Sequence, residues 1–68
     1  MTIDECQNAL SAAGWNIGDV FVTVRGESFW QVYPFRGEQR IVARAPSQHD
    51  AWQEAFRTCE QIKTPRQL

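Results

Sequence analysis

The chain is predicted to be a small α+β domain in which a helix, a three-stranded antiparallel sheet and a second helix follow one another. Three observations predict this order: a capped apolar stripe of helical period near the amino terminus, period-two alternation in the middle, and a longer helical stripe near the end. With 68 residues, 43% of them hydrophobic, the chain can form one small core. We expect one domain over residues 1–63 and a frayed tail over 64–68.

The first helix is predicted over residues 3–13. Thr2 and Glu5 stand at the spacing of a capping box, in which each side chain bonds the backbone amide of the other residue. Gly14 can adopt the left-handed conformation that ends a helix. The apolar residues between these signals recur at intervals of three and four and form one stripe: Ile3, Cys6, Leu10 and Ala13.

Alternating residues and two turns predict three strands, over 19–25, 29–35 and 38–45. A second hairpin centred on Arg36 and Gly37 would place Trp30 opposite Ala43, and a three-residue first loop over 26–28 would place Val24 opposite Trp30. In this register one face of the sheet is apolar and is covered by both helices. Its expected members are Val20, Val22, Val24, Trp30, Val32, Ile41 and Ala43.

The second helix is predicted over residues 48–62. Pro46 ends the preceding strand, and Ser47 is a preferred residue at the start of a helix. The helix carries a strong apolar stripe made of Ala51, Trp52, Ala55, Phe56, Cys59 and Ile62. We expect Leu10, Trp30, Trp52 and Phe56 at the centre of the core.

Charge and cysteine content indicate no particular partner class. The net charge is −1, so no strong field favours nucleic acid or membrane. An acidic start with no leader pattern, and no run near the roughly 18 apolar residues of a membrane span, predict a cytoplasmic protein. Cys6 and Cys59 lie on the apolar stripes of different helices, and we expect buried, reduced thiols.

The uncovered face of the sheet is the candidate binding surface. Aromatic rings among arginines on such a face suit a protein or peptide partner, or single-stranded nucleic acid as the alternative. The face is equally explained as solvated, with Tyr33 and Arg40 forming a cross-strand cation–π pair. The candidate binding residues are Phe21, Thr23, Arg25, Gln31, Tyr33, Arg40 and Arg44, beside Phe29 and Val42.

The first strand is also a candidate for pairing with a further strand. The segment from Val20 to Val24 contains no charge or proline, whereas the third strand carries Arg40 and Arg44. We therefore expect the first strand to recruit its own copy, in a homodimer, or a partner peptide. The alternative is that the edge is short, or that residues 15–18 fold over it.

Catalysis, a metal and a cofactor are not predicted. The single histidine, His49, has no identified carboxylate that would orient it, and the cysteines lie on apolar stripes. Cys6, Cys59 and His49 lack the tight ligand spacing of a structural zinc site. The sequence predicts a small non-enzymatic interaction module.

Two resemblances accompany this prediction. The α-β-β-β-α order resembles double-stranded-RNA-binding domains, whose last helix begins with lysines, where this chain has Ser47-Gln48-His49-Asp50. A second pattern resembles small bacterial proteins of unassigned function and implies no activity. It comprises Trp30-Gln31-Val32, Gly37-Glu38, Ile41-Val42-Ala43 and the segment from Asp50 to Ala55.

Overall fold

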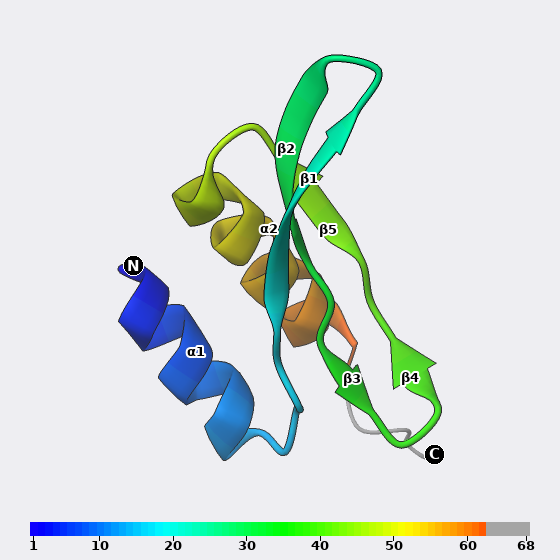
Figure 1. Cartoon of the computed structure of the whole chain (residues 1–68). Coiled ribbons are helices and arrows are strands. Elements are labelled where there is room, and N and C mark those ends of the chain that lie inside the picture. Colours follow the sequence, from blue (N-terminus) through cyan, green and yellow to red (C-terminus); the bar gives the residue numbers. More distant parts are fainter. Residues whose placement is uncertain (63–68) are drawn as a thin grey trace.

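A computed structural model describes residues 1–62 and shows an α+β fold with two helices and antiparallel strands (Figure 1). The predicted tail, 64–68, lies outside the described residues. The elements in chain order are α1 (Ile3–Ala12), β1 (Asp19–Val24), β2 (Glu27–Val32), β3 (Phe35–Arg36), β4 (Gln39–Arg40), β5 (Ala43–Ala45) and α2 (Gln48–Gln61).

Both helices begin where the capping residues predict. The Thr2 amide donates to Glu5 Oε1 at 2.8 Å, and the Glu5 amide donates to Thr2 Oγ1 at 3.1 Å, which completes the capping box of α1. Gly14 has a φ of 89°, and the Trp15 amide returns to the Leu10 carbonyl at 3.0 Å. At the start of α2, Ser47 Oγ accepts the Asp50 amide at 3.1 Å.

The prediction of one three-stranded sheet is wrong in its strand count. The structure has a three-stranded sheet in the order β1-β2-β5 and a separate two-stranded sheet, β3-β4. The interruption falls at Pro34, which has no amide to donate to a ladder. Pairing resumes on both sides of it, because Phe35 exchanges two 2.8 Å bonds with Asn16 and the Ile41 amide donates to the Pro34 carbonyl at 3.0 Å. The two sheets therefore form one continuous ribbon with a break at the proline.

The first hairpin turns earlier than predicted, and this reverses the faces of β1. Arg25 and Gly26 have φ values of 53° and 83° and form a two-residue turn of the type I′ family, so Val24 pairs with Glu27. Trp30 therefore lies opposite Phe21 and not opposite Val24. A shift by an odd number of residues moves every side chain of a strand to the other face. The prediction that Val20, Val22 and Val24 belong to the inner face is wrong.

The second hairpin is shifted by an even number of residues, and its faces are as predicted. Trp30 pairs with Ala45 and Val32 pairs with Ala43, because the turn is at Gly37 and Glu38. Val32 and Ala43 are accordingly both buried. A two-residue error in register changes the partners and leaves the apolar face intact.

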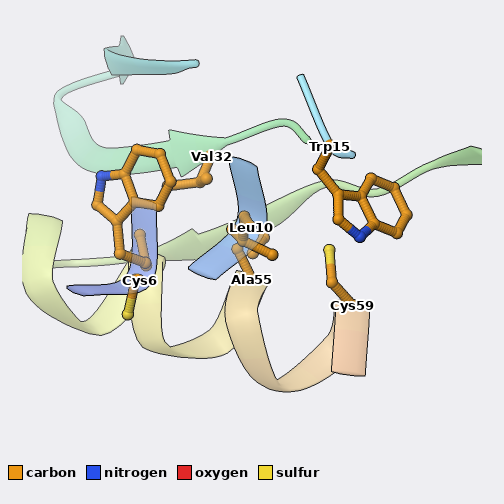
Figure 2. Close-up of a cluster of buried hydrophobic side chains, with 9 residues drawn as sticks. Cys6, Leu10, Trp15, Val32, Ala55 and Cys59 are labelled. Carbon is orange, nitrogen blue, oxygen red and sulfur yellow. The ribbon is translucent and has the colours of Figure 1, made fainter. Parts of the chain in front are cut away.

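The core lies between the helices and the inner face of the sheet. α2 packs against β2 and β5, and α1 packs alongside α2 in roughly the same direction (Figure 1). Figure 2 shows side chains from both helices and from β2 meeting in this space. Trp30 and Phe56, expected at the centre, are half-buried at its margin. The buried residues are Cys6, Leu10, Trp15, Val32, Ala43, Ala51, Trp52, Ala55 and Cys59.

Asp19 joins β1 to the first turns of α2. Its Oδ2 accepts hydrogen bonds from Trp52 Nε1 at 3.1 Å and from Gln48 Nε2 at 2.9 Å. The carboxylate therefore satisfies the polar edge of the most deeply buried indole. Because Asp19 points toward α2, alternation along the strand turns Val20 away from it.

Candidate interaction surface

The sheet surface opposite the helices is here called the open face. Because Asp19 points toward α2, its orientation identifies which residues belong to this face. Side chains alternate along each strand, and residues directly opposite one another share a face. Val20 therefore shares a face with its partner Gln31, which in turn lies opposite Arg44. Applied to the whole ribbon, this places on the open face Val20, Val22, Val24, Glu27, Phe29, Gln31, Tyr33, Phe35, Arg40, Val42 and Arg44.

The open face is apolar over much of its area. Val42 is 56% exposed and Val24 is 52% exposed, and Val20, Tyr33 and Phe35 also remain exposed. Isolated apolar side chains on a surface need no explanation, but a contiguous group on one sheet face is typical of an interaction site. Nothing within residues 1–62 covers this group, because both helices lie on the other side.

Two guanidinium groups lie over aromatic rings of the open face. Arg44 Cζ is 5.7 Å from the Phe29 ring centroid, and Arg40 Cζ is 5.5 Å from that of Phe35. Arg44 Nε also donates to Gln31 Oε1 at 2.9 Å. Among residues 1–62, no carboxylate lies within 4.0 Å of either guanidinium. The open face therefore combines apolar side chains with two cations that have no carboxylate partner among these residues.

Gly18 allows the Tyr33 ring to pack closely against the backbone just before β1. A Cβ atom at Gly18 would lie 2.6 Å from Tyr33 Cε1, well inside van der Waals contact. The backbone holds the same pair together, because the Tyr33 amide donates to the Gly18 carbonyl at 3.1 Å. A large ring across a glycine fills the space that the missing side chain leaves.

The structure brings together four of the seven predicted binding residues. Gln31, Tyr33, Arg40 and Arg44 all lie on the open face. The predicted cation–π pair of Tyr33 and Arg40 is wrong, because Arg40 lies opposite Phe35, two residues beyond Tyr33.

The other three predicted residues lie elsewhere. Phe21 and Thr23 are on the helix side of β1, where the Phe21 ring is 5.3 Å from the Trp30 ring and Thr23 Oγ1 is 3.0 Å from Ser28 Oγ. Arg25 is in the turn. In their place the open face has the valines of β1, and also Phe35. Gly26 directly after Arg25 was the available signal, since a glycine at the second position favours a two-residue turn of this type.

The two cysteines are buried and free, as predicted. Burial raises the pKa of both thiols above the ordinary value of 9.0, and for Cys59 the positive charge of Arg36 opposes part of this rise. Cys59 lies beside Trp15 in the core (Figure 2). A reactive cysteine requires a lowered pKa and access to solvent, and these thiols have neither.

His49 is exposed at the start of α2. Its Nε2 is 2.9 Å from the Met1 carbonyl and its Nδ1 is 3.6 Å from Asp50 Oδ1. The contact with Met1 ties the amino terminus to α2. The described part of the chain contains no group of three or more histidine, cysteine or acidic side chains able to hold a metal ion.

Two hollows lie beside the helices. A shallow groove of about 580 Å³ runs between β5 and α2; it is lined by Val42 and Arg44 of the open face and by polar side chains of α2 that include Asp50, Glu54 and Arg57. Arg57 donates to Glu54 Oε1 at 2.6 Å and so neutralises part of this groove. A smaller pocket of about 190 Å³, lined by Leu10, Trp15 and Phe56 among others, lies between the helices.

Comparison with known proteins gives no match to a family model, to a curated protein or to a solved structure. Across residues 1–62, neither helix has the length and apolar character needed to cross a bilayer. The functional inference therefore depends on the geometry of the open face.

Proposed function

We propose that the chain is a non-enzymatic interaction module that binds a polypeptide through the open face. The observation that supports it is the apolar group Val20, Val24, Tyr33, Phe35 and Val42, all at least 38% exposed on a sheet face that no element within residues 1–62 covers. A partner that covers such a group gains about 25 cal/mol of binding free energy for each Å² of apolar area removed from water.

The two arginines specify the chemistry of the partner. Arg40 and Arg44 flank the apolar side chains, and a guanidinium pairs well with a carboxylate. A partner that alternates apolar and acidic side chains, as an extended segment does, would satisfy the valines and both cations together. We therefore assign an acidic, apolar polypeptide as the ligand.

Single-stranded nucleic acid is the second candidate. Arginines beside Phe29, Tyr33 and Phe35 favour it, because bases stack on exposed rings. However, Arg44 and Arg40 already lie over Phe29 and Phe35, which leaves Tyr33 as the ring free of a guanidinium within the described residues. A net charge of −1 also provides little attraction for phosphates.

A peptide titration tests the proposal. The probes are a synthetic peptide that alternates leucine with glutamate, the same peptide with lysine for glutamate, and a single-stranded oligonucleotide. The readout is the methyl signals of Val20, Val24 and Val42, which report on the open face directly. We expect saturable shifts with the glutamate peptide and much weaker shifts with the lysine peptide.

Matched charge variants locate the site. Arg44→Gln should weaken binding of the glutamate peptide, whereas Asn8→Asp lowers the net charge by the same amount at an exposed position on α1 and should leave binding unchanged. An equal loss of peptide affinity in both variants would show that binding depends only on net charge and would refute the site. Oligonucleotide binding that falls steeply with salt, with no peptide response, would assign the face to nucleic acid.

A further inference from the structure

The free edge of β1 presents unused backbone groups. Gly18 and Asn16 bond across to Tyr33 and Phe35, so even-numbered residues of this ladder point their backbone groups toward β2. Asp19, Phe21 and Thr23 consequently point their amides and carbonyls outward. β1 is the end strand of its sheet, and no other strand within residues 1–62 pairs with that side.

This edge lacks the features that usually prevent strand pairing. Between Val20 and Val24 there is no charge, proline or bulge, and the strand is six residues long. The opposite edge strand, β5, has three residues and carries Arg44. The closed end of the β1–β2 hairpin also extends beyond the first turn of α2 (Figure 1), so α2 does not cover it.

Apolar side chains are exposed on both faces of β1. On the open face Val24 is 52% exposed, and on the helix side Phe21 is 54% exposed. A strand added at the edge would cover both residues at once and would also satisfy the outward backbone groups. A ligand confined to the open face would leave Phe21 in water.

We propose that β1 pairs antiparallel with β1 of a second copy of the chain, around a two-fold axis at Phe21. In this register the two Phe21 residues face each other and Asp19 faces Thr23 of the other copy. Every outward amide and carbonyl of Asp19, Phe21 and Thr23 gains a partner. Each Asp19 carboxylate lies beside a hydroxyl and not beside the other carboxylate, and Val20 meets Val22 across the interface.

The self-pairing goes beyond the proposed function, because it uses the strand edge and not the open face. The dimer would join two sheets edge to edge and bring the β1 valines of both copies into one row. Peptide binding and self-pairing can be disproved independently. A monomeric chain can still bind a peptide on its open face, and a dimer can form with that face unoccupied.

A lysine at the axis tests the interface. Phe21→Lys places like charges opposite each other and should raise the dimer dissociation constant by roughly tenfold or more. The matched control is Gln61→Lys, at the exposed end of α2, which should dimerise like the wild type. Analytical ultracentrifugation gives the constants, and circular dichroism verifies that both variants fold. A wild type that stays monomeric at millimolar concentration would overturn the proposal.

Two further measurements test the register. The amides of Phe21 and Thr23 should become more protected from hydrogen exchange as the protein concentration rises, and protection that is independent of concentration would refute the pairing. Thr23→Lys should still dimerise, because the lysine faces Asp19 of the other copy. Dissociation of Thr23→Lys together with Phe21→Lys would exclude the axis at Phe21. Peptide binding by monomeric Phe21→Lys would show that the open face functions without the dimer.

Discussion

The Arg36 guanidinium lies over the Trp15 ring, with Cζ 4.3 Å from the ring centroid, and so joins the end of α1 to the β3-β4 hairpin. Its Nη1 donates to the Ala13 carbonyl at 2.9 Å, and its Nε donates to Gln39 Oε1 at 3.0 Å. One side chain therefore binds a helix end, covers a buried indole and braces its own hairpin.

Removing this cation should loosen the end of α1. Arg36→Gln loses both the cation–π contact and the bond to the Ala13 carbonyl, and we expect the free energy of unfolding to fall by about 1–2 kcal/mol. Urea unfolding followed by tryptophan fluorescence measures it. Arg57→Gln, which breaks only the exposed pair with Glu54, should cost about 0.5 kcal/mol or less. Equal losses in the two variants would contradict the role of Arg36.

The contact of Gly18 with Tyr33 can be measured by a double-mutant cycle. Gly18→Ala should displace the Tyr33 ring and destabilise the fold by about 1 kcal/mol. In a Tyr33→Ala background the same change should be nearly neutral, because the clashing ring is absent. A cost that persists in that background would place the strain in the backbone and not in the ring.

The first turn can be strengthened. Arg25 has a φ of 53°, which most L-residues adopt only at a cost and which asparagine tolerates. Arg25→Asn should raise the free energy of unfolding by about 0.5–1 kcal/mol. Gly26→Ala is the control: its Cβ would meet no atom within 4 Å, so a loss of about 1 kcal/mol there would come from the positive φ alone.

Alkaline pH should reveal the buried thiols. Because burial raises the pKa of Cys6 and Cys59 above 9.0, the unfolded chain loses these protons at a lower pH than the folded chain does. The thiols' contribution is therefore fully present below pH 9.0 and is lost progressively above it. Chemical unfolding at a series of pH values should show a steeper decline in the wild type than in Cys6→Ala. Identical slopes would contradict burial of the Cys6 thiol.

Local signals predicted the helices closely. The capping box at Thr2 and Glu5 and the Ser47 cap each depend on residues within one turn, and both caps form as expected. The end of α1 was placed one residue too late. Such signals are short in range and compete with little else in the fold.

Strand register was harder to predict, because it depends on turn geometry. The predicted loop over 26–28 places the β1 valines on an apolar inner face, which is the usual arrangement of a half-buried sheet. The structure instead follows the preference of Arg25-Gly26 for a two-residue turn. That preference turns the three β1 valines away from the helices and leaves Val20 and Val24 exposed, so the rule that apolar residues turn inward fails at the proposed binding surface. Sequence reasoning identified most of the β2, β4 and β5 members of the open face and missed those of β1 and Phe35 in β3.

The short Arg25-Gly26 turn also allows the β1–β2 hairpin to form during synthesis before α2 has been made. A hairpin closes within about 1–10 μs once both strands are available, whereas α2 is made later in the chain. At about 5–20 residues per second, the ribosome completes β2 a second or more before α2 emerges to cover Val32 and Trp30. During that interval both sides of the nascent hairpin are apolar, so the chain is most prone to aggregation before its last helix exists.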